Sequence, residues 1–74
     1  MSAVDDLAAE LKARYERPGG VGKVVALHLF GIERAAALAS ISLPALLLKA
    51  GLADSYKTEL RKAMNLAAYV TIKR

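Results

Sequence analysis

The sequence contains no cysteine, and this absence removes several kinds of chemistry at once. Without cysteine the chain has no disulfide bonds, no thiol nucleophile and no cysteine-bound zinc. A chain without disulfides fits a reducing compartment, so we expect a cytoplasmic protein. The amino terminus carries Asp5 and Asp6 rather than a basic cluster before an apolar run, so no targeting signal is predicted.

Histidine is almost as scarce, since His28 is the only one. It has no companion histidine or cysteine and no carboxylate at the spacing of metal ligands, so we expect a hydrogen-bonded or surface-edge histidine. No arrangement of serine, histidine and aspartate and no acidic pair indicates catalysis, and so short a chain offers little room for a deep pocket. We therefore expect a protein that is not an enzyme, with no cofactor, metal or small-molecule ligand.

A hydrophobic run of membrane-spanning length is also missing. The longest uncharged stretch, residues 35–48, is shorter than the ~18–20 residues that a span needs, and Pro44 interrupts it. Even so, 55% of the 74 residues are hydrophobic, many of them alanine. A chain of this length buries only about 60–65% of its unfolded surface, so we expect one domain over residues 1–74 with a marginal core. Apolar surface that the core cannot take up favours a homodimer.

Acidic residues are scarce in the carboxyl-terminal part of the chain. Basic and acidic residues are equal in number from Met1 to Leu48, whereas from Lys49 onward basic residues outnumber acidic ones six to two, so the whole net charge of +4 lies there. This asymmetry is typical of a surface that binds nucleic acid. An anionic protein or lipid surface would also attract it.

The clearest pattern in the sequence is a pair of helices joined by a turn. Ser42 can cap the first helix by accepting a hydrogen bond from a free backbone N–H, and Pro44 suits its first turn. Gly51 stands where this short helix would end in a left-handed residue, and Asp54 or Ser55 can cap the second helix. The order of parts is that of a helix-turn-helix.

Both helices of the pair have an apolar stripe. In the first helix the stripe consists of Leu46, Leu47 and Ala50. In the second helix, expected over residues 55–67, it consists of Tyr56, Leu60, Ala63, Met64 and Ala67. The opposite face of the second helix consists of Lys57, Thr58, Arg61, Lys62 and Asn65. Lysine and arginine match phosphate oxygens, and arginine and asparagine can also bind the edges of guanine and adenine, so this face suits the major groove.

These helices resemble those of small prokaryotic helix-turn-helix-like domains. The resemblance lies in the runs LLLKAGL at 46–52, SYKTELRK at 55–62, LAAYV at 66–70 and, upstream, HLFGI at 28–32. It covers most of the chain and implies a helical domain that binds DNA, alone or attached to larger proteins, without implying a ligand or a catalytic residue. There is one departure. Counting from Gly51, the position where many helix-turn-helix sequences keep a branched apolar residue falls on Lys57, with Tyr56 one place early.

The residues before this pair predict supporting helices. A first helix of about three to four turns is expected after a cap at Ser2. Its buried stripe consists of Val4, Leu7, Ala8, Leu11 and Tyr15. Glu10 and Arg14 on this helix are spaced for a surface ion pair, and residues 18–20 (PGG) end it in a turn.

Residues 19–23 (GGVGK) look like the end of a phosphate-binding loop. Val24 stands where that motif needs serine or threonine, and a helix rather than a strand precedes it, so we interpret the glycines as a plain turn. The apolar run that follows predicts a central helix over residues 22–39 with a break near Gly31, although Val24 to Phe30 also fits a buried strand. The stripe of this helix consists of Val25, Leu29, Ile32, Ala36 and Ala39.

Together these patterns predict an all-α bundle of about four helices that contains a helix-turn-helix and ends in a short extended or β tail over residues 69–72. We expect it to bind double-stranded DNA as a homodimer, in the manner of a small transcriptional regulator. The expected DNA-binding residues are Lys49, Ser55, Lys57, Thr58, Arg61, Lys62 and Asn65. The alternative is a protein–protein interaction or oligomerisation module that binds no nucleic acid, and a weaker one is a basic helix that binds an anionic membrane surface.

Overall fold

The computed structural model describes residues 3–17 and 19–71, and this part of the chain is all-α, as predicted. It forms α1 (Ala3–Glu16), α2 (Lys23–Glu33), α3 (Ala35–Leu38), α4 (Leu43–Ala50) and α5 (Tyr56–Leu66). The expected cap at Ser2 lies outside the described residues. No helix in the described part is both long enough and apolar enough to cross a membrane.

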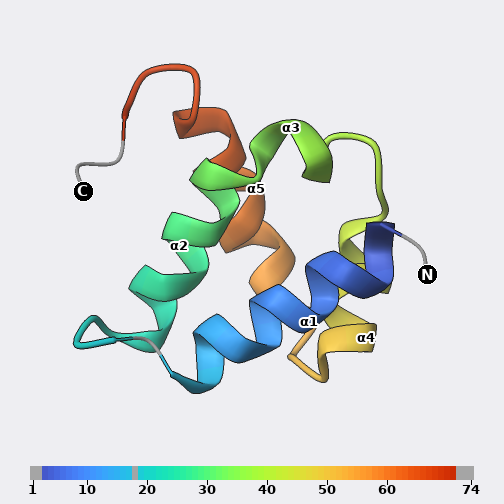
Figure 1. The fold of residues 1–74 in the computed structure, drawn as a ribbon. Helices are drawn as coiled ribbons and strands as arrows, with labels where there is room; N and C mark the ends of the chain where they lie inside the picture. The colour runs from blue at the N-terminus through green and yellow to red at the C-terminus, as the bar shows by residue number, and fades with distance from the viewer. Residues whose placement is uncertain (1–2, 18, 72–74) are drawn as a thin grey trace.

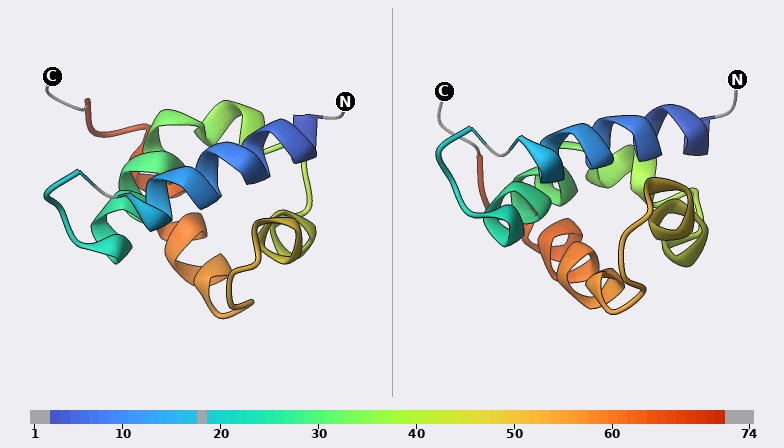
Figure 2. Two further views of the ribbon diagram at one scale, coloured as in Figure 1. Left: turned by 60° about the horizontal axis from the view of Figure 1, so that its bottom comes forward. Right: turned by 90° about the horizontal axis from the view of Figure 1, so that it is seen from below.

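The helices form a bundle in which α1 lies across α2 and α4 (Figures 1 and 2). Helix α5 lies on the side of the bundle away from α1, and its most extensive contact is with α2. The short helix α3 follows α2 and also contacts α5. Of the two helices of the helix-turn-helix, α4 therefore packs mainly on α1 and α5 mainly on α2.

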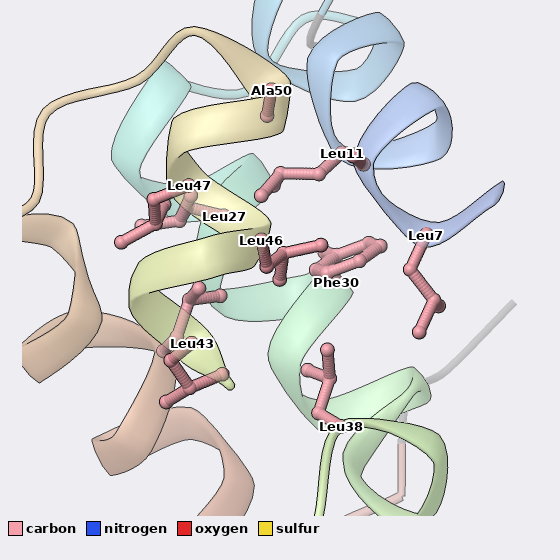
Figure 3. Close-up of a cluster of buried hydrophobic side chains, with 11 residues drawn as sticks. Leu7, Leu11, Leu27, Phe30, Leu38, Leu43, Leu46, Leu47 and Ala50 are labelled. Atoms are coloured by element: carbon pink, nitrogen blue, oxygen red, sulfur yellow. The ribbon is translucent and has the colours of Figure 1, made fainter. Parts of the chain in front are cut away.

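The core consists mainly of leucine side chains around one aromatic ring (Figure 3). Phe30 of α2 is fully buried, and leucines from every helix surround it. These leucines are Leu7, Leu11, Leu27, Leu38, Leu43, Leu46, Leu47 and Leu60. Among the described residues no polar or charged side chain is buried. The inward positions predicted for α1 at Leu7, Ala8 and Leu11 are confirmed.

Helix α2 runs without interruption through Gly31, and the break predicted near this glycine lies three residues later, at Arg34. The helix ends at Glu33, and Arg34, with φ −110° and ψ 18°, separates it from α3. At Gly31 an added Cβ would lie 2.6 Å from the Cβ of Ala63 in α5 and 3.3 Å from the carbonyl oxygen of Leu60. The glycine is therefore required by the close approach of the α2 and α5 backbones.

The buried face of α2 also differs from the predicted stripe. The helix buries Ala26, Leu27, Phe30 and Gly31, whereas Val25, which was expected inside, is 46% exposed. Because α2 is apolar on nearly all sides, the spacing of its apolar residues does not select one face. The contact with α5 selects the face that carries the glycine.

The segment between α1 and α2 is a turn, as predicted. Gly19 and Gly20 have φ values of 67° and 94°, which are left-handed conformations that favour glycine. The segment follows a helix, as expected, so the strand that a phosphate-binding loop requires does not precede it.

The tail after α5 does not form the β alternative in the part that the structure describes. Tyr69 lies in a turn, and Val70 and Thr71 have no regular secondary structure. Residues 3–17 and 19–71 contain no strand, so no sheet edge is available there for pairing. Ile72, the last residue of the predicted tail, lies outside the described residues.

Candidate nucleic-acid interface

Helix α4 begins and ends at the predicted residues. The Ser42 hydroxyl accepts a hydrogen bond from the backbone N–H of Ala45 at 3.3 Å, which satisfies a group that the helix leaves free. At the other end Gly51 is left-handed, with φ 74°. The N–H of Leu52 donates to the carbonyl of Leu47 at 2.9 Å, which is the wide hydrogen bond of a Schellman motif. This glycine turn sets the direction in which the chain leaves toward α5.

Helix α5 begins near the predicted residues but without the predicted side-chain cap. Ser55 makes no capping hydrogen bond, and the Asp54 carboxylate accepts instead from Nζ of Lys57 at 2.9 Å. The first N–H groups of the helix are bonded to backbone carbonyls, Tyr56 to Ala53 at 3.1 Å and Lys57 to Asp54 at 3.0 Å. Because backbone carbonyls already accept from these two N–H groups, neither of them is left free for a side-chain cap.

The two faces of α5 are divided as the sequence predicts. Leu60 and Ala63 are fully buried, and Tyr56, Met64 and Ala67 are partly buried. The five residues of the opposite face are all exposed and line one open hollow of about 230 Å³. We call this face the α5 surface; it consists of Lys57, Thr58, Arg61, Lys62 and Asn65. The inward position of Tyr56 and the outward position of Lys57 settle how the helix is rotated.

The basic groups of the α5 surface differ in their partners. Nζ of Lys57 lies 2.9 Å from the Asp54 carboxylate, and Nζ of Lys62 lies 3.9 Å from that of Glu59. Arg61 has no ion-pair or hydrogen-bond partner within the described part of the chain. Its guanidinium is therefore the group on this surface that can bind an anion without first giving up a carboxylate.

The two other predicted DNA-binding residues do not line this hollow. Ser55 is exposed just before α5 and adjoins the surface in sequence. Lys49 lies on the last turn of α4, where its Nζ is 2.9 Å from the Asp5 carboxylate of α1. It lines a second hollow together with Lys12 and Lys23, which sequence reasoning had not selected.

His28 is hydrogen-bonded, as predicted, and the bond joins α2 to α5. Its Nε2 donates to the Glu59 carboxylate at 2.6 Å. This hydrogen bond lowers the pKa of Glu59; partial burial of the carboxyl raises it, and the charge of Lys62 adds to the lowering. In the described part of the chain no group of three or more histidine, aspartate or glutamate side chains is placed to hold a metal ion.

A pair of tyrosines joins the start of α5 to α1. The hydroxyls of Tyr15 and Tyr56 are 2.8 Å apart, and the two rings meet edge to face with centroids 5.6 Å apart. The hydrogen bond with Tyr15 raises the pKa of Tyr56. Sequence periodicity placed both tyrosines on inward faces, but it carried no signal that they contact each other.

Comparison with known proteins gives one family. The profile of a family described as HTH-like domain matches residues 3–73, which is nearly the whole chain. No curated protein and no solved structure matches the chain.

Proposed function

Because the chain belongs to the family of HTH-like domains, we propose that it binds double-stranded DNA by placing the α5 surface in the major groove. The observation that carries this proposal is the row of exposed basic and amide side chains along one face of α5, directly opposite the face buried in the core. A helix fixed by its buried face and charged on its outer face fits a groove lined with phosphates.

The chemistry of each residue suggests its role. Lys57, Thr58, Arg61 and Asn65 would face the base edges, since arginine pairs with guanine and asparagine with adenine through two hydrogen bonds each. The remaining predicted residues would contact the phosphate backbone, and these are Lys49, Ser55 and Lys62. Of the groove-facing residues, Arg61 is the best placed because its guanidinium is unpaired within the described part of the chain.

The contacts that fix α5 to the rest of the domain support a role for this helix in recognising DNA. The helix is held along its length by the contact of Ala63 with Gly31, at its start by the hydroxyl of Tyr56, and between these points by the hydrogen bond of Glu59 with His28. A helix held at three places keeps its backbone in one position, which lowers the entropy lost on binding.

We propose that the protein is a small transcriptional regulator that works as a homodimer in the cytoplasm. Two-fold symmetric helix-turn-helix proteins bind two half-sites about one helical turn apart, so a homodimer would double the contacted sequence. In this role the protein needs no catalytic residue.

The proposal can be tested by fluorescence anisotropy. A labelled mixed-sequence duplex is titrated with the full chain at low salt and again at near-physiological salt. We expect Arg61→Ala to weaken binding about fivefold or more while the circular dichroism spectrum stays that of the parent. Arg17→Ala is the matched control, because Arg17 is an exposed arginine outside the α5 surface. Equal affinity of the parent and Arg61→Ala would exclude this helix face from the interface.

Exposed apolar side chains favour a second candidate function, a protein–protein interaction module. Leu48 on α4 is 81% exposed and Tyr69 after α5 is 85% exposed, and burying large apolar side chains stabilises protein interfaces. Apolar contacts are not weakened by salt, whereas phosphate contacts are lost steeply as salt rises. Absence of duplex binding even at low salt would favour this candidate.

A further inference from the structure

A second basic hollow lies beside the amino-terminal end of α5. It has a volume of about 400 Å³ and is formed by α1, the start of α2 and the end of α4. We call it the lysine hollow; it is lined by Lys12, Tyr15, Glu16, Lys23, Lys49, Ala50, Gly51 and Leu52. The end of α1, the start of α2 and the connection from α4 to α5 all lie along the lower edge of the molecule in Figure 1 and face the viewer in the right panel of Figure 2.

Folding separates the charges of the amino-terminal half, although they balance in the sequence. Arg14 pairs with Glu10 at 3.2 Å and also with Glu33, and Nε of Arg34 donates to Glu10 at 3.0 Å. This cluster joins α1 to α2 and takes up two arginines and two glutamates. Neither of these glutamates lines the lysine hollow, so they do not neutralise its lysines through direct contact.

The three lysines of the hollow differ in their interaction partners. Lys12 is exposed and has no partner within the described part of the chain. Nζ of Lys23 lies 5.1 Å from the centre of the Tyr15 ring, which leaves its positive charge uncompensated. Lys49 is paired with Asp5. Lys12 and Lys23 are therefore the groups that are available to an anion.

The arrangement fits a chain of phosphates better than one small anion. The lysines come from three different helices around an open hollow, and each ammonium is a flexible point charge that can follow successive phosphate oxygens. The Glu16 carboxylate, which also lines the hollow, disfavours a single anion held at the centre. Phosphates of a DNA strand follow one another at about 3.4 Å along the helix axis, so a surface of this kind can contact more than one.

The hollow lies next to the start of α5, the helix that carries the α5 surface. Tyr15 lines the hollow, and its hydroxyl is 2.8 Å from that of Tyr56, the first residue of α5. The molecule measures 30 × 25 × 23 Å, which is less than the ~34 Å of one turn of duplex. A single duplex that receives α5 in its groove is therefore long enough, within one turn, for its backbone to pass over the hollow.

We propose that Lys12 and Lys23 bind backbone phosphates of the same duplex whose major groove receives α5. This inference rests on the proposed function and adds a second contact surface to it. It assigns a role to lysines that belong to the charge-balanced half of the sequence.

The salt dependence of duplex binding tests this assignment. Each phosphate contact contributes about 0.9 to the log–log slope, so Lys12→Gln/Lys23→Gln removes about 1.8 from it. Between ~50 and ~200 mM salt the parent should then lose about 12-fold more affinity than the double variant. Glu16→Gln should change binding in the opposite direction and tighten it at low salt. Lys12→Gln alone, which breaks no contact in the described part of the chain, is compared with Arg17→Gln, a control with the same loss of charge outside the hollow.

The outcomes separate this inference from the proposed function. If the parent binds duplex and Arg61→Ala weakens it, but the lysine variants keep the parent's affinity and slope, the lysine hollow is not a DNA contact although the α5 surface is. If the lysine variants weaken binding and Arg61→Ala does not, the hollow binds DNA and the α5 surface does not. Loss of binding to vesicles of equal parts phosphatidylcholine and phosphatidylserine, with duplex binding unchanged, would identify a lipid-binding surface and overturn the proposal. A parent that binds no duplex would overturn both.

Discussion

Replacing Gly31 by alanine tests whether the contact between α2 and α5 is as close as the structure shows. The new Cβ would lie 2.6 Å from the Cβ of Ala63, whereas two carbon atoms in contact prefer about 3.5–4.0 Å. The Cβ of Ala63 cannot rotate away because it is attached directly to the backbone. One of the two helices therefore has to move by about 1 Å, away from the leucine core that both contribute to.

The magnitude follows from two opposing terms. Overpacking of this kind costs about 1–3 kcal/mol, and the rigid neighbour places Gly31→Ala toward the upper end of that range. Alanine in a helix regains about 1 kcal/mol relative to glycine. The expected net loss is about 1–2 kcal/mol in the free energy of unfolding, measured by urea denaturation followed by circular dichroism at 222 nm.

A second substitution makes the test specific to this contact. Ala63→Gly removes the opposing Cβ and by itself costs about 1 kcal/mol in helix propensity. In combination with Gly31→Ala it should relieve the overlap, so the double variant is more stable than the sum of the single changes by about 2–3 kcal/mol, the cost of the overlap. Additive effects, or stabilisation by Gly31→Ala alone as at an open helix position, would refute the close approach of the two backbones.

Two further predictions concern a helix cap and a titrating pair. Ser42→Ala removes the hydrogen bond to the N–H of Ala45 and should cost about 1 kcal/mol, seen as a melting temperature lower by about 4–8 °C; an unchanged melting temperature would show that water replaces the cap at no cost. The hydrogen bond from His28 lowers the pKa of Glu59 below its ordinary value of 4.5, so the stability it contributes is present above about pH 4.5 and is lost as the pH falls through the lower folded value. Glu59→Gln should therefore flatten the fall in unfolding free energy at acid pH relative to the parent, and identical acid limbs would contradict this linkage.

The boundaries of α4 were predictable from the sequence because a few neighbouring residues decide them. A serine hydroxyl reaches an N–H three residues later, and a glycine adopts the left-handed conformation at almost no cost, so Ser42 and Gly51 act locally. The start of α5 was placed correctly, but its capping was not. There the backbone carbonyls of Ala53 and Asp54 accept hydrogen bonds from the first N–H groups of the helix, those of Tyr56 and Lys57.

The buried face of α2 was not predictable in the same way. A helix that is apolar nearly all round offers several equivalent stripes, and the one that is buried depends on the neighbour it meets. Gly31 looked like a helix break because glycine has a low helix propensity, while its role as a contact depends on Ala63, far away in the sequence.

The candidate interface likewise has a part that was predictable from the sequence and a part that was not. Helical spacing was enough to predict that Lys57, Arg61 and their neighbours are exposed on one face. It gave no indication that Lys12 and Lys23 line one hollow with Lys49, because that depends on where α1 crosses the bundle. Long-range placement of charge is set by the tertiary fold and not by local sequence.

The leucine core has a consequence for how the protein responds to its surroundings. Since no polar or charged side chain in the described part of the chain is buried, the interior contains no ion pair whose strength depends on the ionic medium. The ion pairs lie at or near the surface, where dissolved ions weaken them and where exposed pairs contribute little to stability. The stability of the core therefore depends on the burial of apolar side chains, whereas the attraction exerted by the surface charges depends on the salt concentration. A change in salt concentration would therefore alter what this surface attracts while the domain behind it keeps its shape.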